Sequence, residues 1–226
     1  MTITYFGHSC FLIESMGFKL LFDPFIKGNP LATMVKVDEI QADYIFLTHG
    51  HGDHVGDSIE IALRTKAKLI STYEVSNYLG LQGIVYYALN IGGKIKLDFG
   101  TVKLVTAQHS SSLPDGSYGA NPCGFVVWNE EICFYVSGDT GLTLDMKLIP
   151  MTCPPLDFAV LCIGDIFTMG YEDAFIASEF IQCNKIIACH FDTFPPILID
   201  HASCEKYFSE KGKSLIIPKI TESIKI

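Results

Sequence analysis

Short apolar segments separated by polar turns run along the chain and predict a protein rich in β-strands. The first three segments are ITYFG, CFLIE and FKLLFD, at residues 3–7, 10–14 and 18–23. Each is rich in β-branched or aromatic residues and is bounded by Gly, His, Ser or Asp-Pro, which favours extended structure. A further strand is expected over residues 43–48, where DYIFLT leads directly into His49.

Helices are expected in the middle and at the end of the chain. The middle helices are predicted near 55–66 and 73–80, with strand KLIST between them, and the later ones near 171–182 and 202–211. From about 84 to 137 the pattern is all strand: IVYYAL, KIKLD, TVKLVTAQ, GFVVW and ICFYVSG. Strands FAVLCIG, KIIACH and SLIIP then alternate with the later helices.

Two β-rich halves, each carrying helices, predict two sheets packed face to face with helices outside. No linker-like or low-complexity stretch interrupts the chain, so residues 1–226 are expected to form a single domain. The chain has 226 residues, of which 49% are hydrophobic and 18% charged. This composition is typical of a globular domain with a sizeable core.

The charge balance bears on the choice of partner. The formal net charge is −9 and the sequence pI is about 5.1, which argues against nucleic acid as the main partner. The mean hydropathy of +0.31 is high, yet no apolar run approaches the ~18 residues that span a bilayer. The N-terminus lacks a signal-peptide pattern, so a cytoplasmic location and a small-molecule substrate are expected. The high apolar content also hints at a homo-oligomer.

Eight cysteines are scattered along the chain, and none forms a C-x-x-C pair. Several lie inside apolar runs, such as ICFYVS and AVLCIG. These cysteines are predicted to be buried free thiols in a reducing compartment, because a chain this long and apolar does not need a disulfide framework.

The segment 48–54 reads Thr-His-Gly-His-Gly-Asp-His and is the densest group of possible metal ligands. In extended backbone alternate side chains point the same way, so His49 and His51 can face one point. Asp53 and His54 follow at a turn and can face a second point nearby. A coincidental polar loop is the alternative, but histidine is uncommon. Neutral imidazole and carboxylate suit zinc and its divalent neighbours, so the segment is predicted to bind metal.

Three more candidate ligands stand at the ends of apolar strands. His109 follows TVKLVTAQ, Asp139 follows ICFYVSG, and His190 follows KIIAC. Each residue taken singly has a structural alternative, as a polar residue that merely ends a strand. Together they favour a site, because open sheet folds place active sites at the carboxyl ends of their strands.

H-x-H-x-D-H, followed by isolated His, Asp and His, resembles the metallo-β-lactamase superfamily. The resemblance covers nearly the whole chain. The phrases GHSCFLIE, GDIFTMGYEDA and HFDTFP resemble a group of small metal-dependent hydrolases similar to the bacterial ascorbate 6-phosphate lactonase. The resemblance implies an α+β fold, a four-layer αββα sandwich of two mixed β-sheets with helices on the outer faces.

The resemblance also implies a ligand set for two divalent metal ions. His49, His51 and His109 would bind the first ion, while Asp53, His54 and His190 would bind the second, with Asp139 bridging them. Zinc is the ion expected most in this superfamily, and manganese or iron is the alternative. Imidazole and carboxylate ligands do not by themselves decide the metal.

Further residues are candidates for supporting roles, each with a structural alternative. His8 is a candidate substrate contact or outer ligand, and Asp23 is the first choice for orienting a ligand imidazole. Asp165 and Thr168, in GDIFTMG, are candidate substrate-positioning residues, or else turn residues before a helix. Packing is expected for Tyr171 and no function for His201. In HFDTFP, Asp192 occupies a position where the resemblance leads us to expect a small residue.

The predicted enzyme is a metal-dependent hydrolase of an ester-like bond, such as a lactone or a phosphorylated small metabolite. Two ions about 3.5–4 Å apart can share a hydroxide that attacks a carbonyl or phosphoryl centre. Asp53, the predicted catalytic residue, could shuttle a proton.

Two other functions stay open: a phosphodiesterase acting on nucleotides, and a non-hydrolytic metal-binding or redox protein on the same scaffold. Diiron relatives usually carry a carboxylate at the His51 position and an attached flavin domain, and this chain has neither feature.

Overall fold

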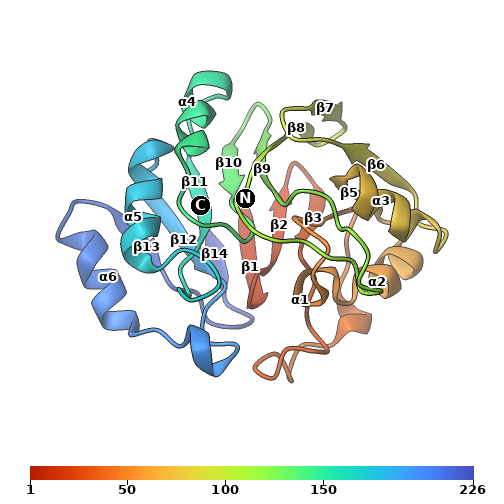
Figure 1. Cartoon of the computed structure of the whole chain (residues 1–226), viewed down its shortest axis with the longest axis horizontal. Coiled ribbons are helices and arrows are strands. Elements are labelled where there is room, and N and C mark those ends of the chain that lie inside the picture. Colours follow the sequence, from red (N-terminus) through yellow and green to blue (C-terminus); the bar gives the residue numbers. More distant parts are fainter. The chain divides into compact units, whose positions relative to one another are not determined.

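Two seven-stranded sheets, each in its own compact unit, make up the fold. The structure is a computed structural model that describes residues 1–226. Unit 1 consists of Met1–Asn90, Ser110–Pro122 and Lys219–Ile226, and unit 2 consists of Ile91–His109 and Cys123–Pro218. Figure 1 labels the elements of both units.

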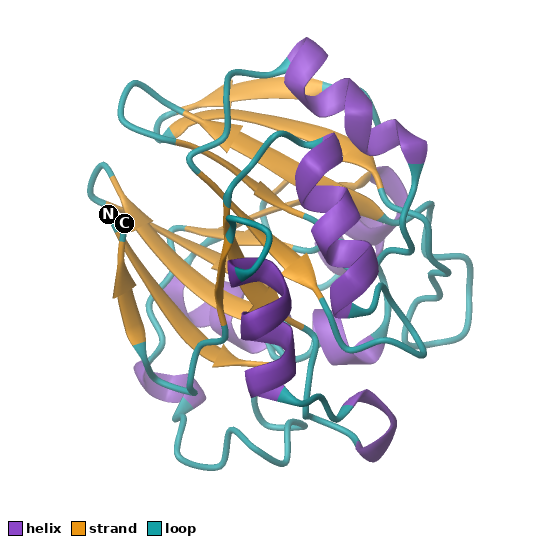
Figure 2. Cartoon of the chain, turned by 90° about the vertical axis from the view of Figure 1, so that its left-hand side faces the viewer, coloured by secondary structure: helices purple, strands orange, loops and turns teal.

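The sheet of unit 1 has the order β14-β1-β2-β3-β4-β5-β6 and is mixed. Strands β14, β1, β2 and β3 pair antiparallel, whereas β3, β4, β5 and β6 pair parallel. Thr2 pairs with Lys225, so the two termini lie side by side, as the labels in Figure 2 show. The strands are β1 (Thr2–Gly7), β2 (Cys10–Ser15), β3 (Phe18–Phe22), β4 (Tyr44–Phe46), β5 (Lys68–Thr72), β6 (Tyr86–Leu89) and β14 (Ser223–Lys225).

The core of unit 1 joins the sheet to its helices. Leu21, Ile45 and Leu69 from the sheet belong to one fully buried cluster with Ile61 of α2 and Val75 of α3. The helical elements are η1 (Val37–Glu39), α1 (Gly52–Val55), α2 (Ser58–Thr65) and α3 (Tyr73–Gly80). Burial of these aliphatic side chains is the main force that holds the helices to the sheet.

The single helix predicted over 55–66 is wrong in its first part. The structure has the short helix α1 and then α2, with a break at Gly56. Gly56 has φ +39°, and a Cβ there would meet the Pro24 carbonyl oxygen at 2.5 Å. Asp57 then accepts hydrogen bonds from the backbone N–H groups of Ile26 and Lys27, both at 2.9 Å. These tertiary contacts override the helical pattern.

The sheet of unit 2 has the order β13-β12-β11-β10-β9-β8-β7 and is also mixed. Strands β10 to β13 are parallel, and β7 to β10 are antiparallel. The strands are β7 (Lys94–Leu97), β8 (Gly100–Thr106), β9 (Cys123–Trp128), β10 (Cys133–Val136), β11 (Phe158–Cys162), β12 (Lys185–Cys189) and β13 (Ser214–Ile216). β11 is buried along its whole length, which explains its uninterrupted apolar sequence.

Helices α5 and α6 pack beside the parallel half of this sheet, as the ribbons in Figures 1 and 2 show. Phe175 of α5 contacts Phe208 of α6 edge to face, with ring centroids 5.4 Å apart. The helical elements of the unit are η2 (Leu144–Leu148), α4 (Ile149–Thr152), α5 (Tyr171–Phe180), η3 (Pro195–Ile197) and α6 (His201–Ser209).

Two mixed sheets with helices confirm the predicted α+β class and its sandwich family of folds. The terminal strand β14 was not predicted, because only three residues form it. No helix of the chain is both long enough and apolar enough to cross a bilayer. All eight cysteines are free thiols, as predicted.

Candidate metal centre

Three imidazoles of unit 1 converge just after β4, where the chain turns into α1. His49 and His54 are completely buried. His49 Nε2 lies 3.0 Å from His51 Nδ1, and the ring centroids of His49 and His54 are 4.1 Å apart. The backbone of His51 is extended, at φ −62° and ψ 147°, and separates the strand end from helix α1. Asp53 and His54 follow it in α1.

The carboxylate of Asp23 orients the imidazole of His54 through a hydrogen bond to Nδ1. Asp23 directly follows β3, and its backbone is in the left-handed region, at φ 39°. Its side chain is buried. It accepts hydrogen bonds from Thr48 N at 2.9 Å and Thr48 Oγ1 at 2.8 Å, and it lies 2.8 Å from His54 Nδ1. With Nδ1–H donating to Asp23, the lone pair of His54 is on Nε2, which is the arrangement of a metal-ligating histidine with its carboxylate partner.

His8 lies inside the same cluster rather than at the surface. Its Nε2 is 3.3 Å from Asp53 Oδ2, and its side chain is fully buried. One potential ligand atom each from His8, Asp53 and His54 lie within 4.8 Å of one another. His8 therefore contacts the one predicted ligand of unit 1 that carries a negative charge.

In unit 2 a single carboxylate oxygen lies near two imidazoles. Asp139 Oδ2 is 2.9 Å from His190 Nε2 and 3.8 Å from His109 Nε2. Asp139 follows β10, His190 follows β12, and both are buried. The parallel pairing of β10, β11 and β12 brings the carboxyl ends of these strands to one edge of the sheet.

Two residues that the sequence did not reveal hold these donors in place. Thr140 Oγ1 accepts a hydrogen bond from Gln108 N at 2.9 Å, and Gly141 N donates to Gln108 O at 3.0 Å. This double contact fixes the segment that carries His109 against the one that carries Asp139. The only signal in the sequence was that Gln108 and Thr140 stand next to the candidate ligands His109 and Asp139.

Gly164 is the second such position, at the end of β11. A Cβ on Gly164 would lie 2.1 Å from the carbonyl oxygen of His190. His190 itself has φ 55°, an unfavourable backbone conformation for a non-glycine residue. Strain of this kind is often found at functional sites, where the surrounding structure compensates for it.

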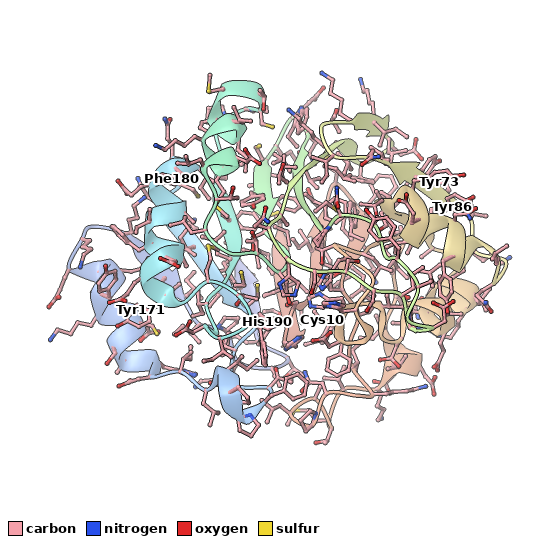
Figure 3. All side chains as sticks on the ribbon, in the orientation of Figure 1. Cys10, Tyr73, Tyr86, Tyr171, Phe180 and His190 are labelled. Carbon is pink, nitrogen blue, oxygen red and sulfur yellow. The ribbon has the colours of Figure 1, made fainter.

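The two thiols closest to the carboxylates are not suited to metal ligation. Burial raises the pKa of Cys10, labelled in Figure 3, and the nearby Asp23 carboxylate raises it further. Burial and then Asp139 raise the pKa of Cys162 in the same way. Both side chains remain protonated thiols at neutral pH, which leaves imidazole and carboxylate as the donors.

The donors of each unit fit a divalent cation. Each cluster combines imidazoles with a carboxylate, and its most buried members exclude bulk water. A cation would balance the buried negative charge of the carboxylate. A nitrogen and oxygen donor set suits zinc, manganese and iron.

The remaining residues singled out in the sequence lie outside the His/Asp groups that could hold a metal ion. Asp165 is exposed after β11, where it accepts a hydrogen bond from Ile166 N at 2.8 Å, and Thr168 follows in the same loop. Tyr171, labelled in Figure 3, contacts Tyr207 with ring centroids 5.2 Å apart. His201 Nε2 lies 2.6 Å from Asp192 Oδ2.

Comparison with known proteins agrees with the fold. The model of the β-lactamase superfamily domain matches residues 2–190. The UPF0173 metal-dependent hydrolase of Flavobacterium johnsoniae is 50% identical over 226 residues and is covered over 100% of both chains. The metallo hydrolase Igni18 of Ignicoccus hospitalis is 32% identical, with a TM-score of 0.89 and coverage of 99% of this chain and 97% of its own.

A more distant structure shares the fold alone. The isothiocyanate hydrolase from Delia radicum gut bacteria is 21% identical, with a TM-score of 0.80 and coverage of 100% of this chain and 99% of its own.

The fold and the His/Asp clusters together define a metal-dependent hydrolase. The chain belongs to the β-lactamase superfamily, as the H-x-H-x-D-H motif predicted.

Proposed function

We propose that the chain hydrolyses an ester-like bond in a small molecule, using two divalent metal ions. The observation that supports this proposal is the position of Asp139 Oδ2, near the Nε2 atoms of both His109 and His190. A carboxylate oxygen close to two imidazoles would serve as a ligand common to both ions. Candidate bonds are a lactone and the ester-like bond of a phosphorylated metabolite.

The number of donors supports a shared site. Zinc in proteins takes about four ligands, so two ions that share one ligand would account for all seven predicted donors. We assign His49, His51 and His109 to the first ion, and Asp53, His54 and His190 to the second, with Asp139 common to both. Zinc is the ion we expect, and manganese or iron would fit the same donors.

The residues have distinct roles in this mechanism. When bound, the ions supply a water molecule of lowered pKa, so that hydroxide is available near neutral pH. Asp53 accepts and returns the proton, and His8 orients the Asp53 carboxylate through its contact at 3.3 Å. Asp23 fixes the ring of His54 through Nδ1. No serine or cysteine nucleophile is needed.

We infer a cytoplasmic location for the enzyme. The support is the set of eight free thiols, of which seven are buried, since such thiols persist in a reducing compartment.

The test combines metal analysis with a substrate panel. Purified wild-type protein should contain about two ions per chain, and it should hydrolyse chromogenic lactones or esters with activity lost on chelation. His51→Ala should lose bound metal and turnover while the circular dichroism spectrum is retained. His201→Ala, which removes the one histidine outside the clusters, is the matched control and should keep both ions.

Three results would contradict the proposal. The first is full metal content and rate in His51→Ala. The second is turnover of phosphodiesters only, which indicates the phosphodiesterase function. The third is two iron ions with a visible oxo-iron band and no hydrolysis, which indicates the redox alternative.

A further inference from the structure

A cavity of about 270 Å³ opens at the carboxyl ends of β11 and β12, with all of its lining residues in unit 2. Ile163 and Gly164 form one side, the first turn of α5 forms another, and residues 196–200 close the third. The backbone of Gly164 is in direct contact with that of His190, as its close approach to the His190 carbonyl oxygen shows. The cavity therefore adjoins a candidate metal ligand.

The rim of the cavity carries apolar side chains that the fold does not bury. Ile166 is 68% exposed and Leu198 is 66% exposed. Ile166 has φ 55°, which is a true outlier for a β-branched residue. The loop is held in this form by Asp165 N donating to Met169 O at 3.0 Å and by Met169 N donating to Thr140 O at 2.9 Å. A strained backbone that presents an apolar side chain to solvent is typical of a binding site.

The charge of the cavity is negative. Asp165, Glu172 and Asp200 line it, and no Lys, Arg or His does. Hydrogen bonds from the side chain and backbone N–H of Ser203 lower the pKa of Asp200, which keeps it ionised. The N-termini of α5 and α6 each contribute about half a positive charge, so three carboxylates leave a net charge of about −2.

We propose that this cavity binds the part of the substrate that is not cleaved, and that it selects an organic cation on a short apolar chain. A protonated amine or a quaternary ammonium group fits the carboxylates, the apolar rim and the aromatic ring of Tyr171, which also lines the cavity. The volume of about 270 Å³ suits a group of a few carbon atoms. This inference rests on the proposed hydrolase function and disfavours phosphorylated substrates.

The binding experiment uses probes that cannot be hydrolysed. Isothermal titration calorimetry on the metal-loaded protein compares butyltrimethylammonium with butanesulfonate. The cation should bind and the anion should not. The double variant Asp165→Asn/Glu172→Gln should weaken cation binding about tenfold, because each exposed carboxylate contributes a factor of about three. Asp173→Asn, also in the first turn of α5 but outside the cavity, is the matched control and should bind as wild type does.

A kinetic experiment uses three chromogenic esters that differ only in a trimethylammonium, neutral or sulfonate end group. The expected order of kcat/KM is cationic, neutral, anionic, and the double variant should reduce the cation preference about tenfold while Asp173→Asn keeps it.

The two experiments separate the two proposals. Cation binding without hydrolysis of any ester supports the cavity and overturns the proposed function. Hydrolysis with no cation preference, together with no cation binding, overturns the cavity proposal and leaves the function standing. Equal loss of cation binding in Asp173→Asn also overturns the cavity proposal, because the effect then comes from net charge alone.

Discussion

Asp23 contacts three groups through two carboxylate oxygens, and this makes it the central outer residue of unit 1. Thr48 donates to it from both backbone and side chain, and His54 donates from Nδ1. A buried carboxylate that accepts several hydrogen bonds is held in one orientation. Asp23 therefore decides both the tautomer and the direction of the His54 ring.

Asp23→Asn should weaken metal binding about 10- to 100-fold with the fold retained. The amide keeps the size of the side chain but cannot accept from all three donors. Competition with a chromogenic chelator measures the affinity, and circular dichroism checks the fold. Asp43→Asn is the control, since Asp43 accepts from Lys19 N at an exposed position. Unchanged affinity in Asp23→Asn would remove Asp23 from the proposed site.

The thiols give a second prediction at the residue scale. Seven of the eight are buried, and only Cys153 is partly exposed. Burial raises the pKa of Cys133 to about 12 and that of Cys204 to about 11, so at pH 8 their thiolate forms are scarce. A thiol-reactive disulfide reagent should label about one thiol per native chain and eight after denaturation. Rapid labelling of several thiols in the native protein would contradict this.

At the scale of elements, the parallel strands β10, β11 and β12 determine where the chemistry lies. Their carboxyl ends carry Asp139, Gly164 and His190 at one edge of the sheet. Because parallel strands point the same way, residues distant in sequence reach the same edge without a long loop. Because the strand ends lie so close together, the position between Asp139 and His190, which is Gly164, accepts only glycine.

Gly164→Ala should displace His190 and destabilise the fold by about 1–3 kcal/mol, as for other overpacked sites. The cause is the Cβ position 2.1 Å from the His190 carbonyl oxygen. Urea unfolding measures the free energy, and the metal content should fall as well. Gly141→Ala is the matched control, because its Cβ would meet only Gln108 O, at an ordinary 3.8 Å. Equal stability of the two variants would exclude the steric explanation.

At the scale of the whole molecule, metal binding should stabilise the chain, because the proposed site binds ions in the folded state. A ligand at 100 times its dissociation constant adds about 2.7 kcal/mol to the stability of the state that binds it. For a chain of this length we expect the unfolding midpoint to rise by roughly 5–10 °C. Calorimetry of zinc-loaded and chelator-treated protein measures the shift.

The same calorimetry on Asp139→Asn provides the control for the shared site. Loss of the bridging carboxylate should abolish most of the metal-dependent shift. A wild-type midpoint that does not respond to chelation would contradict the proposed site, even if the chain still hydrolyses esters.

The sequence by itself determined the superfamily, the α+β class, most of the strands and the candidate ligands. These features depend on local patterns: apolar runs set the strands, and the dense motif at residues 48–54 needs no distant partner to be recognised. The single-domain prediction for 1–226 and the assignment of ligands to two ions remain predictions.

Only the tertiary structure decided which residues support the donors. The break at Gly56, the contact of His8 with Asp53, the Thr140–Gln108 hydrogen bond and the glycine at 164 all depend on approaches between segments distant in sequence. The acidic cavity also depends on the tertiary structure, because its walls come from two separate stretches of the chain. Local periodicity reports which face of an element is buried, but it does not report which other segment covers that face.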